Sequence, residues 1–140
     1  MAATIQVDIV SAEGEIFSGA AAMVFVPAVM GELGIAPRHA PLLTMLKAGE
    51  IRVQTPDGEE HGFYVGGGAL EIQPQRVTVL ADTALRAKDL DEAAAVAAKQ
   101  RAEEALRERT DQIGIAEAQA ELLRAVVQIK MLERIRKLRR

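Results

Sequence analysis

The side chains that could carry out chemistry in this chain are two histidines, a run of three glycines and a basic C-terminal segment. His39 lies in a proline-rich stretch and His61 in a predicted strand, so they lack the spacing of a metal-binding pair. Gly66-Gly67-Gly68 is not followed by the Lys and Ser or Thr of a phosphate-binding loop. The chain has no cysteine, which excludes disulfides, thiol catalysis and thiolate metal sites. These residues predict a binding protein rather than an enzyme with its own catalytic site.

The charges are distributed unevenly along the chain. Residues 124–140 carry seven basic residues against Glu133 alone, whereas residues 89–123 carry four basic and nine acidic residues. A basic helix end favours an acidic partner, although a solvated charged surface is an alternative that charge alone leaves open. Nucleic acid is disfavoured, because the whole chain has a net charge of -3 and only 3% aromatic residues for stacking on bases.

The elements that must position these groups change in character at about residue 88. Residues 1–88 hold all five prolines and ten of the eleven glycines, and residues 89–140 hold only Gly114. Gly and Pro are typical of turns between short strands, whereas a run of Ala, Glu, Arg and Leu free of both favours helix. The sequence therefore predicts a β domain over residues 1–88 and a helical arm over residues 89–140.

Period-2 alternation predicts the strands of the first domain. Ile5, Val7 and Ile9 alternate with polar residues, as in a half-buried strand. Pro56-Asp57-Gly58 predicts a hairpin turn, Pro27 is expected to end a strand, and Gly66-Gly67-Gly68 is expected to form a bulge or a close backbone contact. The other expected strands are residues 15–17, 23–26, 51–54, 62–65, 69–72 and 77–80. Strands this short predict an antiparallel sandwich or a flattened barrel.

The arm is predicted to be a helical hairpin. Asp89 is expected to cap the first helix, with Glu92 three residues later, and the turn is expected over residues 107–114. The apolar stripe of the first helix consists of Ala93, Ala94, Ala97, Ala98, Ala102, Ala105 and Leu106. The stripe of the second consists of Ile115, Ala118, Leu122, Val126, Ile129, Leu132 and Ile135, with a further line of Leu123, Val127, Met131 and Leu138. An alanine methyl contributes only about 0.8 kcal/mol when buried, so an arm packed through alanines is expected to be released easily.

Residues 31–44, GELGIAPRHAPLLT, resemble the signature loop of the epsilon subunits of bacterial F-type ATP synthases, whose pattern is close to GxxGILPGHAPLLT. The resemblance continues through residues 63–71, 77–82 and 89–93, and covers the whole chain in order. It implies an antiparallel β-sandwich of about ten short strands followed by a C-terminal two-helix antiparallel hairpin. Arg38 departs from the pattern, which has glycine there. If that position needs a positive φ, the loop is expected to differ locally.

The resemblance also implies a function. Such a subunit belongs to the central stalk, has no catalytic activity, and turns with the rotor while proton flow drives ATP synthesis in the alpha/beta head. Its sandwich binds the gamma subunit and the ring of c subunits, and its arm restrains ATP hydrolysis. Carried over by position, the residues that bind gamma and the c ring are Glu32, His39, Ala40, Pro41, Leu42 and Thr44. Those of the inhibitory basic helix are Arg134, Arg136 and Lys137.

Some members of this family bind ATP through the motif (I/L)DxxRA in the first helix of the arm. The corresponding residues here begin with Leu90 and Asp91, but Ala94 replaces the arginine of the motif. Arg101 and Arg124 match further basic positions, whereas Gln128 stands where ATP-binding members have an arginine. A charge-assisted contact is worth about 1.5–3 kcal/mol, so the loss of two predicts weak or absent ATP binding. No other cofactor and no metal are expected.

Residues 1–10 lack the features of a signal peptide, and no stretch is apolar enough to span a bilayer. These absences predict a soluble protein of the cytoplasm. The resemblance implies, more narrowly, a peripheral subunit on the cytoplasmic side of the bacterial inner membrane. Two alternatives remain open at this point. One is a free-standing adaptor whose basic arm binds another acidic protein, and the other is a small nucleic-acid-binding protein, which would bind duplex with a steep salt dependence.

Overall fold

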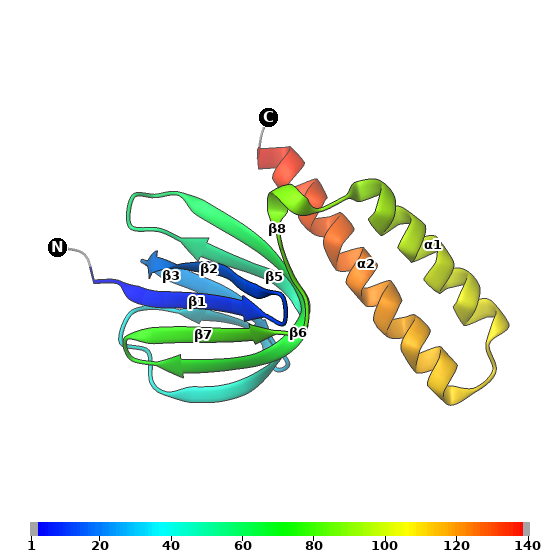
Figure 1. Ribbon diagram of the computed structural model, residues 1–140, viewed down its shortest axis with the longest axis horizontal. Coiled ribbons are helices and arrows are strands. Elements are labelled where there is room, and N and C mark those ends of the chain that lie inside the picture. Colours follow the sequence, from blue (N-terminus) through cyan, green and yellow to red (C-terminus); the bar gives the residue numbers. More distant parts are fainter. Residues whose placement is uncertain (1–2, 139–140) are drawn as a thin grey trace. The chain divides into compact units, whose positions relative to one another are not determined.

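The computed structural model describes residues 3–138 (Figure 1). The chain divides into two compact units, Met1–Ala87 and Lys88–Arg140. The described residues of the first unit form strands, and those of the second form helices. The predicted combination of a β-sandwich with a helical hairpin is confirmed.

Eight strands are present in the described part of the first unit, where the resemblance implied about ten. They are β1 (Ile5–Ser11), β2 (Gly14–Ala21), β3 (Met23–Ala28), β4 (Gly31–Ile35), β5 (Leu42–Gln54), β6 (Glu60–Gln73), β7 (Arg76–Ala81) and β8 (Ala84–Arg86). They follow the order β2-β1-β7-β6-β5-β3-β4, and β8 also pairs with β6. β6 is one continuous strand that joins the expected strands at residues 62–65 and 69–72, and β5 extends the expected strand at residues 51–54 back to Leu42.

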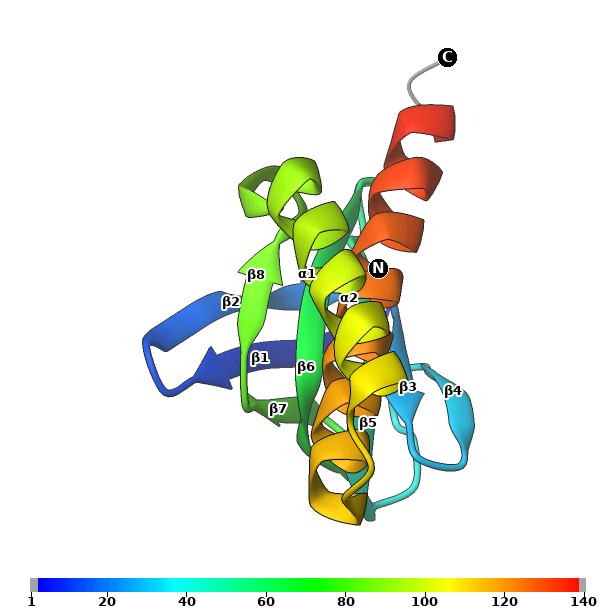
Figure 2. The ribbon, with the colours of Figure 1, turned by 90° about the vertical axis from the view of Figure 1, so that its right-hand side faces the viewer.

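The long strands β5 and β6 take part in both layers of the sandwich. The first half of β5 pairs with the second half of β6. This part of β6 pairs in turn with β7, and β7 pairs with β1. The second half of β5 pairs with β3 and with the first half of β6, which also pairs with β8. Figure 2 shows β1 and β2 on one side of this unit and β3 and β4 on the other. The β5–β6 hairpin, whose predicted turn at residues 56–58 is confirmed, therefore joins the two layers.

The three glycines at residues 66–68 lie inside β6, where they were expected to form a bulge or a close backbone contact. Gly67 and Gly68 have φ values of 112° and 140°, a region that L side chains rarely adopt. A Cβ atom at Gly68 would lie 2.2 Å from the carbonyl oxygen of Leu80. The prediction is confirmed, and the glycines let one strand bend from one layer into the other without ending.

Two further details differ from the expectations. β1 and β7 pair in parallel, so the sandwich is not wholly antiparallel. Pro27 lies within β3 rather than ending it, at a place where the register between β3 and β5 shifts. Proline has no backbone N–H to donate, so it fits a strand where the ladder is already interrupted.

The core of the first unit lies between the two layers and is aliphatic. Ile5, Val7 and Ile9 are fully buried, which confirms the alternation expected for the first strand. Among the described residues no polar or charged residue is buried as a whole. Both layers supply apolar side chains to this one cluster.

A short 3-10 turn, η1 (Ala87–Asp89), spans the boundary between the units, and the second unit contains two helices, α1 (Glu92–Glu108) and α2 (Gln112–Leu138). The helices pack against each other in an antiparallel hairpin, as expected (Figure 1). Their buried residues are small apart from one methionine: Ala95, Ala102, Gly114, Ala118, Ala125 and Met131. No helix within residues 3–138 is long and apolar enough to cross a membrane.

The helix ends were predicted two or three residues away from their actual positions. Asp91, rather than Asp89, is the N-cap of α1, and its side chain accepts a hydrogen bond from the amide of Ala94 at 3.2 Å. The cap is displaced because η1 takes up Asp89 before the α-helix begins. α2 begins at Gln112 instead of Ile115, since Asp111 accepts from the amide of Gly114 at 2.9 Å and so caps the helix.

Candidate partner-binding surfaces

Large apolar side chains are exposed at the turn between β3 and β4 and on the nearby part of β5. Val29 and Met30 form this two-residue turn, and Met30 is 75% exposed. Leu43 and Met45 lie two residues apart on β5, so they project from the same face, and Leu43 is 74% exposed. The amide of Val29 donates to the carbonyl of Met45 at 3.0 Å, which holds the turn against β5.

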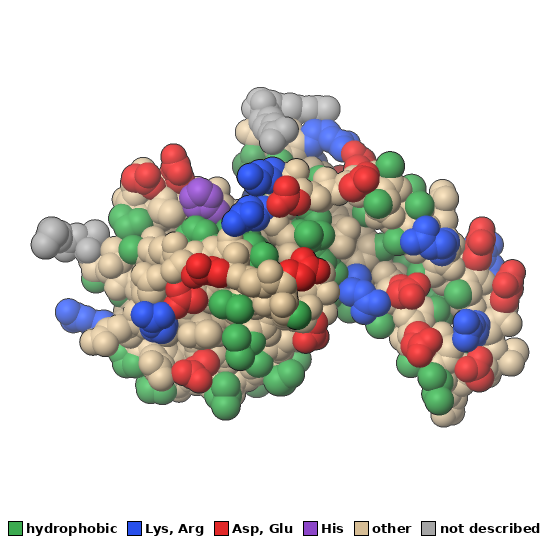
Figure 3. Space-filling model, in the orientation of Figure 1, with side chains coloured by type: hydrophobic (Ala, Val, Ile, Leu, Met, Phe, Trp, Pro, Cys, Tyr) green, Lys and Arg blue, Asp and Glu red, His purple; other side chains and the backbone are tan. Residues whose placement is uncertain are grey.

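Leu80 on β7 extends this exposed surface across the sheet. Met45 lies opposite Ala69 on β6, and Ala69 lies opposite Leu80, so the three occupy one cross-strand row. Leu80 is exposed as well. Figure 3 shows hydrophobic side chains gathered along the lower side of this unit. We refer to Val29, Met30, Leu43, Met45 and Leu80 as the apolar patch. Contiguous exposed apolar surface of this kind is typical of a protein interface.

The segment before β5 contains a tight turn with a left-handed arginine. The amide of His39 donates to the carbonyl of Ala36 at 3.2 Å, with Pro37 and Arg38 between them. Arg38 has a φ of 67°. Proline followed by a residue of positive φ defines a type II turn, whose third position favours glycine. The amide of Arg38 donates to the carbonyl of Pro74 at 2.8 Å, which ties this turn to the one between β6 and β7.

The backbone at Arg38 has the positive φ that was considered for this position from the sequence. The expected glycine is absent, and Arg38 itself adopts the left-handed conformation that glycine adopts readily. The left-handed conformation is about 1–2 kcal/mol less favourable for a residue with a side chain than for glycine. The hydrogen bonds donated by the amides of Arg38 and His39 offset this strain. Next to it, Nδ1 of His39 donates to the carbonyl of Ala40 at 2.7 Å, which fixes the orientation of the ring.

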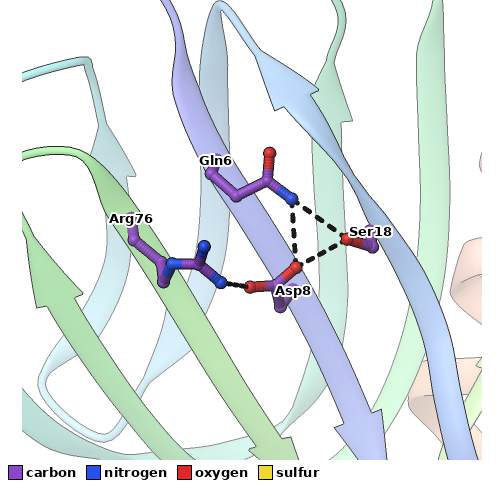
Figure 4. A network of polar contacts seen from close by, with 4 residues as sticks. All are labelled: Gln6, Asp8, Ser18 and Arg76. Carbon is purple, nitrogen blue, oxygen red and sulfur yellow. Dashed lines mark hydrogen bonds and ion pairs between the residues drawn. The ribbon is translucent and has the colours of Figure 1, made fainter.

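A polar network lies on the outer side of β1, β2 and β7 (Figure 4). Asp8 accepts hydrogen bonds from Ser18 at 2.7 Å and from Gln6 at 3.1 Å, and it forms an ion pair with Arg76. Burial by itself raises the pKa of Asp8, but the hydrogen bonds from Ser18 and Gln6 and the charge of Arg76 together hold this pKa below its usual value. Because each group is satisfied within the network, its role is to tie three strands together.

The basic end of the arm is joined to the beginning of the same hairpin. Arg136 forms an ion pair with Glu92, the first residue of α1. Arg136 and Lys137 are exposed in the last turn of α2, and Arg134 is half-buried. Cations at this end of a helix also interact favourably with the helix dipole. One of the predicted inhibitory residues is therefore engaged within the hairpin.

Of the residues predicted for ATP binding, Arg101 lines a hollow on the arm. A shallow hollow of about 450 Å³ is lined by Arg101, Glu104, Ala105, Glu108 and Arg109. Its lining includes neither Leu90, Asp91 nor Arg124. Two carboxylates beside two guanidinium groups make a poor site for a polyphosphate, because the acidic groups repel it. Asp91 is already engaged as the cap of α1.

Comparison with known families covers both units. The family model described as ATP synthase, delta/epsilon chain, β-sandwich domain, matches residues 4–87. The one described as ATP synthase, delta/epsilon chain, long α-helix domain, matches residues 88–133. The chain belongs to the ATP synthase delta/epsilon family.

Relatives within the delta/epsilon family match along nearly the whole chain. A protein of Nitrosococcus oceani named ATP synthase epsilon chain is 64% identical over 137 residues, which are 98% of this chain and 98% of that one. The ATP synthase epsilon chain of Halorhodospira halophila is 59% identical over 136 residues, 96% of both chains.

Solved structures share the fold at low identity. A chain of the Euglena gracilis mitochondrial ATP synthase OSCP/F1/c-ring structure superposes with a TM-score of 0.78 and 18% identity, covering 95% of this chain and 81% of that one. A chain of the Tetrahymena thermophila mitochondrial ATP synthase central stalk/c-ring gives a TM-score of 0.66 and 12% identity, covering 91% and 96% respectively.

The residues of this delta/epsilon chain that were predicted to bind gamma and the c ring all lie within residues 32–44. Glu32 lies on β4, His39, Ala40 and Pro41 lie between β4 and β5, and Leu42 and Thr44 begin β5. Leu42 packs against the core. Because side chains alternate between the two faces of a strand, Leu43 and Met45 are exposed on the other face of β5.

Sequence reasoning missed four members of the apolar patch, namely Val29, Met30, Met45 and Leu80, and named Leu43 only within the resemblance. The start of β5, Leu42-Leu43-Thr44-Met45-Leu46, is apolar on both faces, so no alternation in the sequence marks Leu43 and Met45 as the outward-facing residues. Nothing local marks Leu80 as a neighbour of Met45, because their relation depends on the pairing of three strands.

Proposed function

We propose that this chain is the epsilon subunit of a bacterial F-type ATP synthase, a non-catalytic part of the central stalk that couples proton flow to ATP synthesis and restrains ATP hydrolysis. The observation that carries this proposal is that both units match the family in order, with high identity to chains of that name over nearly their full length. No described group of acidic residues and histidines could hold a metal ion.

The apolar patch and the adjoining turn at residues 36–39 are the proposed site for the gamma subunit and the c ring. Two observations support this assignment. The patch is exposed and apolar, as an interface requires, and Glu32 and His39 lie on the elements that border it. The solved structures of similar fold belong to ATP synthase assemblies that contain a c ring. The chain would then sit on the cytoplasmic side of the inner membrane without entering it.

The basic end of α2 is the proposed restraint on hydrolysis. Arg134, Arg136 and Lys137 would bind an acidic segment of the alpha/beta head, since charge complementarity favours this pairing. The hairpin is packed largely through alanines, and each buried methyl contributes only about 0.8 kcal/mol. Such a hairpin can open at moderate cost, which a movable restraint requires.

ATP is proposed to bind weakly or not at all. Ala94 and Gln128 stand at two positions where ATP-binding members carry arginine, and the hollow beside Arg101 also contains two glutamates. Calorimetric titration of the isolated chain with ATP tests this. Submicromolar binding would contradict it.

The proposed restraint is tested with a complex purified from cells that lack this chain. Adding the full chain should lower ATP hydrolysis, and the triple variant with Gln at Arg134, Arg136 and Lys137 should lower it much less. A control triple variant with Gln at Lys99, Arg107 and Arg109 loses the same charge on α1 and its C-cap and should inhibit like the wild type. Failure of the chain to copurify with gamma would favour the free-standing adaptor instead.

A further inference from the structure

Arg52 on β5 links two residues of neighbouring strands. Its guanidinium donates to the carboxylate of Glu32 at 3.1 Å, and its Cζ lies 4.4 Å from the centre of the Phe25 ring. Phe25 on β3 lies opposite Arg52 in the strand register, and Glu32 lies on β4, on the far side of β3. The arginine therefore crosses the whole of β3 to reach its partner.

Gly34 makes this arrangement possible. It lies opposite Phe25 on β4, and a Cβ atom there would lie 3.3 Å from Cε1 of Phe25 and 2.9 Å from Cε of Met23. Because no side chain occupies this position, the Phe25 ring can lie flat beside the backbone of β4. Arg52 can then stack on the ring and extend beyond it to Glu32.

The link reaches a part of the sheet where the backbone ladder is weak. Among the described strands, β4 lies at one end of the order and pairs only with β3. β3 itself loses its regular register with β5 between Phe25 and Ala28. The β3–β4 turn that carries Val29 and Met30 follows directly after this interruption. A side-chain link from β5 to β4 compensates for the backbone pairing that is missing there.

We propose that Arg52 is a positioning residue for partner binding: it holds Glu32 and the β3–β4 turn in the orientation in which Val29 and Met30 meet the central stalk. This inference rests on the proposed function. In this arrangement Glu32 acts within the chain, as the acceptor for Arg52. The Arg52 side chain is 27% exposed and the Glu32 side chain is 57% exposed. The partner therefore meets a paired carboxylate with little net charge, and the apolar turn supplies the contact.

A double-mutant cycle tests the proposal, because two residues that act as one unit give effects that do not add. The full chain carrying R52Q, E32Q or both is titrated into gamma bound to the c ring, purified without this chain. Each of the three variants should bind about three- to tenfold more weakly, by the same factor within error. R52K keeps the charge but not the planar stacking group. Its affinity for gamma and the c ring should lie between that of R52Q and that of the wild type.

The control is R76Q, which breaks another cross-strand ion pair, that with Asp8, away from the β3–β4 turn. It should bind like the wild type. The methyl resonance of Met30 in the free chain gives a second readout, which does not depend on binding. It should shift in R52Q and E32Q and stay unchanged in R76Q.

The inference is overturned if R52Q binds like the wild type, if the effects of R52Q and E32Q multiply in the double variant, or if the Met30 resonance does not respond to R52Q. If the wild type does not bind gamma, the proposed function fails, while the Met30 measurement still decides whether Arg52 positions the turn.

Discussion

Arg136 in the last turn of α2 forms an ion pair with Glu92 in the first turn of α1, 44 residues earlier in the chain. The pair closes the open end of the helical hairpin. It also occupies one of the basic side chains proposed to bind the catalytic head. An acidic partner must therefore compete with Glu92 for Arg136.

This competition predicts opposite effects for the two halves of the pair. Glu92→Gln frees Arg136 and should strengthen the inhibition of ATP hydrolysis, whereas Arg136→Gln removes the binding group and should weaken it. Both side chains are at least half exposed, so the pair is worth no more than about 0.5 kcal/mol and the effects should be about twofold. ATPase assays of the reconstituted complex measure them. Glu104→Gln, an exposed charge change on the same helix, serves as control, and a change in the same direction for both variants would refute the competition.

The cap of α1 is expected to matter for the stability of the arm. Asp91→Ala leaves the amide of Ala94 without its acceptor and should lower the free energy of unfolding of the helical unit by about 1 kcal/mol. Asp91→Ser should retain most of the stability, and Asp89→Ala should have little effect because Asp89 lies in η1. Chemical denaturation followed by circular dichroism at the helix band measures this. Equal losses for Asp89→Ala and Asp91→Ala would mean that the cap is wrongly assigned.

Arg38 is expected to tolerate glycine better than a β-branched residue. Its φ of 67° suits glycine, so Arg38→Gly should leave the free energy of unfolding unchanged or raise it by up to about 1 kcal/mol. Arg38→Val should lower it by about 1–2 kcal/mol, because branching at Cβ is hardest to accommodate at positive φ. Thermal unfolding of the two variants compares them directly. A valine variant as stable as the wild type would show that the turn opens without cost.

The network around Asp8 predicts how stability depends on pH. The folded-state pKa of Asp8 lies below the unfolded value, so its contribution is fully present above the unfolded pKa and is lost as the pH falls through the folded pKa. The free energy of unfolding should therefore fall, as the pH is lowered through the ordinary Asp pKa of 3.8 and on through the lower folded-state pKa, by more in the wild type than in Asp8→Asn. Glu13→Gln, outside the network, should follow the wild type. Identical acid profiles for wild type and Asp8→Asn would contradict the assignment.

The features predicted well from the sequence depend on local patterns. The alternation from Ile5 to Ile9 specifies a buried face, and Pro56-Asp57-Gly58 specifies a turn, because each depends on neighbouring residues alone. The helical hairpin likewise follows from a long run without proline. Gly66-Gly67-Gly68 separated two expected strands, yet positive φ at two glycines lets β6 continue, which only its neighbours Leu80 and Ala81 reveal.

The features that escaped prediction join residues far apart in the chain. Glu32 and Arg52 pair across three strands, and the parallel pairing of β1 with β7 depends on how the whole sheet closes. The exposed turn at Val29 and Met30 could not be distinguished from a buried apolar pair without the register of β3. Long-range pairings of this kind leave no periodic signal in a single sequence.

The most direct test of the proposed function is the binding of the full chain to gamma and the c ring through the apolar patch. Isothermal titration should show saturable binding for the wild type. The double variant Met30→Ser/Met45→Ser should bind about tenfold or more weakly, because two large apolar contacts are lost. Ile113→Ser changes a side chain on the arm that is as exposed as Met30, and it should bind like the wild type. Binding by the Met30/Met45 variant that equals the wild type, or no binding by the wild type, would contradict the account.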